Sequence, residues 1–127
     1  MRMSLDISIS ESRKFLICTV HVPVTTEIAK QIALETDRFA VSSGIRNRLI
    51  DVRNVQNVES VIRNYDLAYK DFGEMKIDRT ARAAVLTALD DSSHDFAILA
   101  LQNAGYNARR FTDEQAAIDW LEEHVSD

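Results

Sequence analysis

Histidine and cysteine are the side chains in this sequence best suited to metal binding or nucleophilic chemistry. The three histidines, His21, His94 and His124, lack neighbours at the spacing of metal ligands. The single Cys18 can form neither an intramolecular disulfide nor a thiolate cluster, and it lies in an apolar stretch, where a thiol behaves as an inert hydrophobic side chain. We therefore predict no metal site and no cysteine nucleophile.

The segment Ser92, Ser93, His94 and Asp95 contains the residue types of a hydrolytic triad. Residues so close in sequence cannot easily align a nucleophile, a base and the group that orients the base. Serine is preferred just before a helix and aspartate in its first turn. We expect Ser92 and Ser93 to cap a helix, with Asp95 in its first turn.

Glycines are scarce, and none follows a predicted strand. Gly44, Gly73 and Gly105 each come just after a predicted helix. Phosphate-binding loops instead place glycines between a strand and a helix. The sequence therefore predicts no P-loop, no dinucleotide site and no cofactor.

Strands and helices that must position the remaining polar groups alternate along the chain. Apolar patterns predict strands over residues 5–9, 15–22, 48–52, 81–89 and 107–111. Helices are predicted from Thr25 or Thr26 to Gly44, over 58–72, over 95–104, and after a capping box of Thr112 and Gln115. Ala116, Ala117, Trp120 and Leu121 should form the buried face of the last helix.

This order predicts a single α/β domain, ββαβαβαβα, over residues 1–127. We expect a mostly parallel sheet with one antiparallel hairpin strand and helices on the sheet faces. The small alanines of 81–89 should let helices approach that strand closely.

Composition favours a globular cytoplasmic protein. The chain is 46% hydrophobic, and its 15 Lys and Arg against 20 Asp and Glu give a formal charge of -5. An acidic balance disfavours nucleic acid and anionic membranes as partners, because both require basic patches. No run reaches the roughly 18 apolar residues of a membrane span.

Polar residues also gather where the predicted parallel strands end. Ligands of open α/β sheets bind beyond the carboxyl ends of strands. Two loops should meet there, and their candidate binding residues are Asp51, Arg53, Asn57, Ser60, Ser92 and His94. The alternatives are two ordinary polar loops, or an active site that joins Asp51, Arg53 and His94 in a cleft and perturbs a pKa strongly.

Two predicted helices carry more apolar side chains than one buried stripe requires. Residues 96–101 are all apolar, and the preceding helix has apolar side chains at helical spacing, namely Val58, Val61, Ile62, Tyr65, Tyr69 and Phe72. We expect most of them to pack in the core. The remainder, Tyr65 among them, would form a homodimer face or a groove for a small apolar ligand.

The segment LIDVRNVQNVESV, residues 49–61, resembles the region after the third strand of STAS domains, the SpoIIAA-like antagonists of anti-sigma factors. The matching residues are Asp51, Val55, Val58, Glu59 and Ser60. The order of elements and the ending FTDEQAAIDWLEE, residues 111–123, resemble an uncharacterised branch grouped with STAS and SEC14-type domains. Ser60 matches the phosphorylated serine of the antagonists, which continue with a small hydroxyl residue and a glycine where this chain has Val61 and Ile62.

Ser60 has two interpretations that do not depend on the resemblance. Its hydroxyl can cap a helix. A phosphate there would lie at the positive end of the helix dipole and add about -1.5 to -2 charges to an acidic protein.

The resemblance implies a regulatory protein-interaction module that binds a protein partner or forms a homodimer, and the residues add no catalytic set. The alternative is a domain of the SEC14/STAS-like type that binds a small apolar ligand or a lipid.

Overall fold

The structure is a computed structural model that describes residues 4–123, and the predicted elements follow one another in the predicted order. The strands are β1 (Leu5–Ile9), β2 (Leu16–Val20), β3 (Arg48–Asp51), β4 (Ala83–Leu86) and β5 (Ala108–Phe111). The helices are α1 (Thr26–Ser43), α2 (Val61–Asp66), the π-helical segment η1 (Leu67–Asp71), α3 (Phe72–Glu74), α4 (Asp95–Asn103) and α5 (Glu114–Glu122). Because α2, η1 and α3 are continuous, we call them together the α2–α3 segment.

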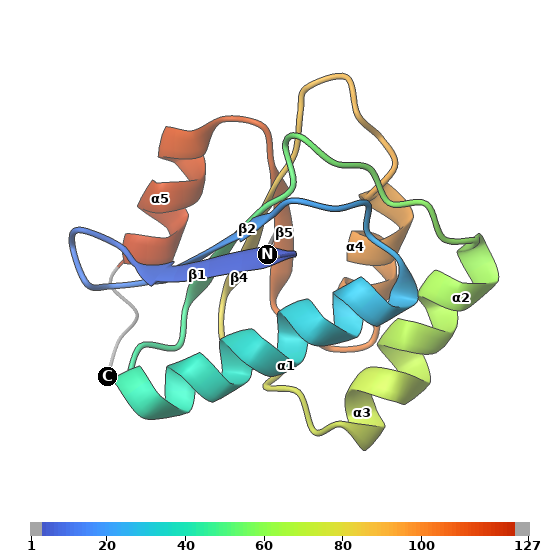
Figure 1. The fold of residues 1–127 in the computed structure, drawn as a ribbon, viewed down its shortest axis with the longest axis horizontal. Helices are drawn as coiled ribbons and strands as arrows, with labels where there is room; N and C mark the ends of the chain where they lie inside the picture. The colour runs from blue at the N-terminus through green and yellow to red at the C-terminus, as the bar shows by residue number, and fades with distance from the viewer. Residues whose placement is uncertain (1–3, 124–127) are drawn as a thin grey trace.

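The five-stranded sheet has the sequential order β1-β2-β3-β4-β5. β1 pairs with β2 in antiparallel orientation, whereas β2 to β5 are parallel. Right-handed crossovers between successive neighbouring strands place every connecting helix on the same face. Accordingly α1, the α2–α3 segment and α4 cover one face, and α5 lies on the other (Figure 1). The expected mostly parallel sheet with one antiparallel strand is confirmed.

Side chains alternate between the two faces of β3, and this alternation determines the face of the sheet on which each polar residue lies. Leu49 packs in a core with Leu86, Trp120 and Leu121 on the α5 face. Ile50 and Val52 pack on the opposite face, against α1. Asp51 is consequently directed to the α5 side of the sheet.

Helix caps differ from the sequence predictions in two places. The N-cap of α4 is His94, without a capping side-chain hydrogen bond, because the Ser93 hydroxyl instead accepts from the backbone N–H of Asn57. Asp113, not Thr112, caps α5 by accepting from the N–H of Ala116. The expected caps of α1 are confirmed, since Thr25 accepts from the N–H of Ile28 and Gly44 adopts a left-handed φ of 77°.

Two further sequence predictions about α5 and the α2–α3 segment are wrong in detail. Ala116 was expected to be buried but is exposed, whereas Ala117, Trp120 and Leu121 are buried. Gly73 lies inside the last helical turn, one residue before the helix ends at Glu74, rather than after the helix.

The apolar stripe predicted for the α2–α3 segment is largely exposed. Val58, Val61, Ile62, Tyr65 and Tyr69 face solvent, and of the six residues in that stripe only Phe72 is buried. The buried face is formed by Asn64, Leu67, Ala68 and Phe72. The π-helical turn explains the change, because the Phe72 N–H bonds the Leu67 carbonyl five residues back and turns Phe72 away from the exposed stripe.

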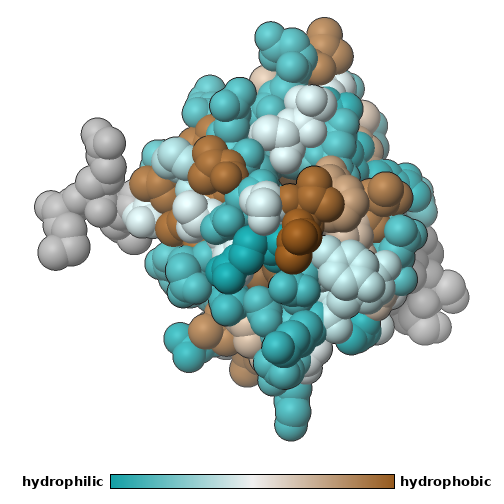
Figure 2. All heavy atoms as spheres, turned by 90° about the vertical axis from the view of Figure 1, so that its right-hand side faces the viewer, coloured by the Kyte–Doolittle hydropathy of each residue, from teal (hydrophilic) through white to brown (hydrophobic). Residues whose placement is uncertain are grey.

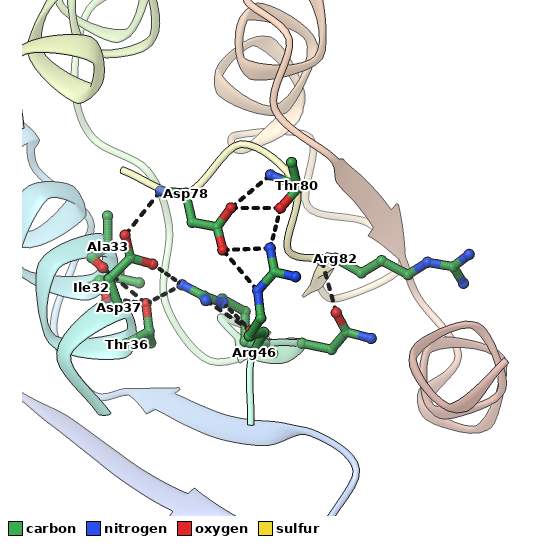
Figure 3. Close-up of polar contacts among 10 residues, drawn as sticks. Ile32, Ala33, Thr36, Asp37, Arg46, Asp78, Thr80 and Arg82 are labelled. Carbon is green, nitrogen blue, oxygen red and sulfur yellow. Dashed lines mark hydrogen bonds and ion pairs between the residues drawn. The ribbon is translucent and has the colours of Figure 1, made fainter. Parts of the chain in front are cut away.

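A buried ion pair ties α1 to β3 at the amino end of the parallel strands (Figure 3). The Arg48 guanidinium, in a residue only 5% exposed, donates to Asp37 Oδ1 at 2.5 Å and to Thr36 Oγ1 at 3.0 Å. The other Asp37 oxygen accepts from the backbone N–H of Asp78. One carboxylate therefore joins α1, β3 and the loop before β4.

Candidate functional site

The β3–α2 loop and the β4–α4 loop lie against each other at the carboxyl ends of β3 and β4. The N–H of Asn57 donates to Ser93 Oγ at 2.9 Å, and His94 Nε2 lies 3.0 Å from the carbonyl oxygen of Val55. The structure thus brings together the two loops that the sequence placed at one rim. The binding role of their side chains stays a prediction.

Asp51 and Arg53 form one ion pair at this rim. Arg53 Nη2 lies 2.8 Å from Asp51 Oδ2, and Arg53 Nη1 lies 3.1 Å from Glu114 Oε1 on α5. Burial acts to raise the pKa of Asp51, but the hydrogen bonds and charge of Arg53 outweigh it and hold that pKa below its ordinary value. Asp51 is therefore a stable carboxylate that cannot serve as a proton donor near neutral pH.

His94 is buried, with only 4% of its surface exposed. Besides the Val55 carbonyl, its Nε2 lies 3.5 Å from Asp91 Oδ2. Asp91 accepts from the Ser93 N–H, and its hydrogen bonds with Ser93 outweigh burial and lower the pKa of Asp91. His94 thus connects the two loops through its ring. Ser92, two residues earlier, is exposed.

The residues required for an active site at the rim do not assemble. Asp51 and Arg53 lie on the α5 side of the sheet, and Arg53 also lines an open groove of about 570 Å³ between the loops that follow β2, β3 and β4. His94 lies on the opposite side, where it lines the core beneath α1 and α4. Asp51, Arg53 and His94 therefore share no cleft in this structure.

Ser60 lies at the start of α2 and caps it. Its side-chain oxygen accepts from the backbone N–H of Arg63 at 3.2 Å, as expected for an N-cap. The loop before it is held by a hydrogen bond of 3.1 Å between the Asn57 and Asn64 amides and by Glu59, whose carboxylate accepts from the Thr26 N–H. Ser60 is itself exposed and therefore accessible to a modifying enzyme.

An exposed apolar surface begins beside Ser60. It consists of Val58, Val61, Ile62, Tyr65 and Tyr69, and we call it the α2 patch. Exposed fractions within it run from 44% for Tyr69 to 72% for Ile62. The rings of Tyr65 and Tyr69 stack at 4.4 Å. Figure 2 looks onto the side that carries α2 and shows hydrophobic side chains near its centre with hydrophilic ones around them.

The exposure of the α2 patch contradicts the expectation that most of these apolar side chains pack in the core. Only Tyr65 among its residues was singled out as a binding candidate. Val61, Ile62, Tyr65 and Tyr69 do share one helical face, whereas Val58 precedes the helix, which begins three residues later than predicted. Spacing alone does not show whether a helical face is turned to the sheet or to solvent. A polar residue such as Asn64 is not expected on a buried face, but its amide is hydrogen-bonded to Asn57 there.

Other chemical groups in the described residues are inert or scattered. Burial is the main cause that raises the pKa of Cys18 to about 12, so this thiol stays protonated in the core. Within residues 4–123, no three His, Cys, Asp or Glu side chains come close enough to hold a metal ion. Nor is any helix of that range long and apolar enough to cross a membrane.

The mixed sheet with an antiparallel first strand, three helical connections on one face and a terminal helix on the other defines a SpoIIAA-like fold. A solved structure with this fold is similar to the chain over 92% of its length and 91% of the other, with a TM-score of 0.52 and 20% sequence identity. That structure is of an uncharacterised protein from the DUF3478 family, from Shewanella loihica PV-4. No protein-family model and no curated protein sequence matches the chain. The likeness shows the fold.

Proposed function

We propose that the protein is a non-catalytic interaction module that docks a protein surface onto the α2 patch, and that a second copy of the chain is its partner. The observation that carries this proposal is the exposure of four large apolar side chains on one face of the α2–α3 segment, with exposed Val58 in the loop just before it. Contiguous apolar surface bordered by polar residues is characteristic of interaction sites. The stacked tyrosines supply rigid contact area with little conformational entropy to lose.

The charge of the chain favours a protein over a membrane or a nucleic acid. Its formal charge of -5 gives no long-range attraction to phosphate groups. Apolar contact with another protein requires no such attraction.

The charges beside the patch favour a second copy. Arg63 and Asp66 are exposed on the same flank of α2. If two α2 helices pack antiparallel about a two-fold axis near residues 64 and 65, Arg63 lies opposite the partner's Asp66, and the reverse pair forms by symmetry. Opposite charges thus face each other along one edge of the interface, with Tyr65 near the axis.

Ser60 is placed to control this docking. A phosphate on its hydroxyl would bring negative charge next to Val61 and Ile62, where apolar contact requires loss of water. The helix itself would tolerate the charge, because anions are stabilised at a helix N-terminus.

The non-catalytic part of the proposal is supported by the state of the polar side chains at the rim. Asp51 forms an ion pair with Arg53, and His94 is buried between Val55 and Asp91. A general base must reach a substrate in a cleft, and neither the paired Asp51 nor the buried His94 is placed to do so.

Sedimentation velocity over a range of protein concentrations tests the proposal. The wild type should dimerise, and Ile62→Glu should be monomeric because a charge would be buried in the patch. Val41→Glu is the matched control, since Val41 is 88% exposed on α1 outside the patch, and this variant should still dimerise. A wild type that is monomeric throughout, or a dimer that Ile62→Glu leaves intact, would refute docking of two copies.

Charge exchange tests the orientation of the two helices. Arg63→Asp and Asp66→Arg should each weaken the dimer, and the double variant should restore it. A double variant weaker than both single variants would refute the antiparallel arrangement.

Ser60→Asp tests the control by charge. It should weaken the dimer while the thermal unfolding temperature stays nearly constant, because aspartate is also a good N-cap. Ser92→Asp, on the exposed β4–α4 loop, is the control and should leave the dimer unchanged. A Ser60→Asp protein that dimerises as well as the wild type would remove Ser60 from the proposal.

A further inference from the structure

We propose that the space between the sheet and the helices α1, α2–α3 and α4 is a binding site for a compact apolar molecule, about one ring in size, that presents one oxygen to the Tyr106 hydroxyl. This inference rests on the core of the protein and is independent of docking at the α2 patch.

A cavity of about 140 Å³ lies in this space. Alanine side chains form much of its wall, with Ala83 and Ala108 side by side on the sheet, Ala33 on α1 and Ala97 on α4. The small alanines of β4 were expected to bring the helices close to the sheet. The structure leaves a space beside Ala83, which the larger side chains of Phe72 and Leu101 also line.

An empty space of this size is unusual in a protein core. Interiors are close-packed, and a void loses the dispersion contacts of every atom that lines it. One larger side chain at Ala33, Ala83 or Ala97 would fill it. A molecule that occupies the cavity would restore those contacts without any change of sequence.

Tyr106 supplies the buried polar group in this wall that is left without a partner. Only 8% of the residue's surface is exposed, and its hydroxyl has no hydrogen-bond partner among residues 4–123. The ring is fixed by an edge contact with Phe72 at 5.7 Å and by the Arg79 guanidinium 4.5 Å from its centre. Burial raises the pKa of Tyr106, against the opposing charge of Arg79, so the phenol stays protonated and can donate.

The other buried polar side chains of the wall are already bonded within the protein. Arg48 is paired with Asp37, Asn64 with Asn57, and His94 with the Val55 carbonyl. Buried polar groups in native proteins nearly always have a partner. The Tyr106 hydroxyl is therefore the group that a ligand in this cavity would satisfy.

The volume limits the class of ligand. An engineered apolar cavity of about 150 Å³ is filled by one benzene molecule. A whole lipid chain is too large for a space of this size, so the occupant is a single ring or a short branched skeleton. One hydroxyl, ether or carbonyl oxygen on it would accept the proton of Tyr106.

Phenol and toluene are matched probes, because they have nearly the same shape and differ in the oxygen. Binding is measured by isothermal titration or by shifts of methyl resonances of residues that line the cavity, such as Leu67 and Ile98. The wild type should bind both probes. Tyr106→Phe should weaken phenol by roughly tenfold, the value of one hydrogen bond, and leave toluene within about twofold.

A cavity-filling variant shows where the probes bind. Ala97→Leu should abolish binding of both probes and raise the thermal unfolding temperature of the free protein. Ala116→Leu makes the same change on the exposed face of α5 and should alter neither. Absence of binding by the folded wild type would overturn the proposal. Equal weakening of phenol and toluene by Tyr106→Phe would overturn the role of the hydroxyl, and binding retained in Ala97→Leu would overturn the location.

Discussion

Replacement of Asp37 with alanine is expected to destabilise the protein strongly, although Asp37 is a single partly exposed residue of α1. Its carboxylate joins the buried Arg48 guanidinium to the Asp78 N–H (Figure 3). In Asp37→Ala the guanidinium keeps Thr36 Oγ1 and the Arg46 carbonyl but loses its counter-charge. A buried charge without a counter-charge is costly, because the interior cannot replace the water removed on folding.

The magnitude follows from the burial of the two partners. Breaking a buried ion pair from one side costs about 3–5 kcal/mol. The Asp37 side chain is 20% exposed, so water can reach part of the vacated space, and we expect the lower end, about 3 kcal/mol. A loss of that size is a large fraction of the total stability of an ordinary domain.

Urea unfolding followed by circular dichroism measures the effect. Two further variants separate the buried charge from general loss of contacts. Arg46→Ala breaks the exposed pair with Asp78 in the same network and should cost about 1 kcal/mol or less. Asp37→Ala combined with Arg48→Met removes both charges and should recover most of the loss. A cost below about 1 kcal/mol for Asp37→Ala, or a double variant less stable than Asp37→Ala alone, would refute the reasoning.

Two other predictions concern the same network and the last helix. Burial acts to raise the pKa of Asp78, but hydrogen bonds from Thr80 and Arg46 lower it to about 2 from the ordinary 3.8. The stability that the Asp78 carboxylate contributes is therefore complete above pH 3.8 and is lost as the pH falls toward 2. As the pH falls from 3.8 to 2, the urea midpoint of Asp78→Asn should therefore fall less than that of the wild type. Midpoints of the two proteins that fall in parallel with pH would contradict this prediction. Asp113→Ala should lower the free energy of unfolding in urea by about 1 kcal/mol, and Thr112→Ala by much less, because Asp113 accepts from the Ala116 N–H. A larger loss for Thr112→Ala would favour the capping box of Thr112 and Gln115.

The fold could be predicted because its signals are local. Alternation over residues 5–9, Thr25 and Gly44 at the ends of α1, and apolar β-branched runs each identify an element without knowledge of its neighbours. The order of those elements then limits the sheet to parallel strands with one antiparallel addition.

Errors arose where two segments compete for the same group. Ser93 is a good helix cap in isolation, but in the structure its hydroxyl accepts from Asn57, which is distant in sequence. The exposed stripe on α2 was assigned to the core because apolar residues are usually buried, and the π-helical turn that separates Phe72 from it has no established sequence signal.

The candidate sites were harder to predict than the fold. The sequence identified the two rim loops, and the structure joins them through Ser93 and His94. It did not identify Tyr106 or the cavity, because a void depends on the distance between layers rather than on any one segment. Alanines that pack closely and alanines that leave space look the same in a sequence.

The π-helical turn of η1 also makes the helical segment sensitive to length at one point. Five residues, Leu67–Asp71, occupy a stretch that a regular helix would cross with one fewer. Deletion of a single residue there is the smallest change that would restore regular hydrogen bonding throughout. It would also swing Phe72 toward Tyr65 and Tyr69 and out of its contact with Tyr106. This segment can therefore gain regular helical hydrogen bonding only by moving Phe72 from its buried face to its exposed face.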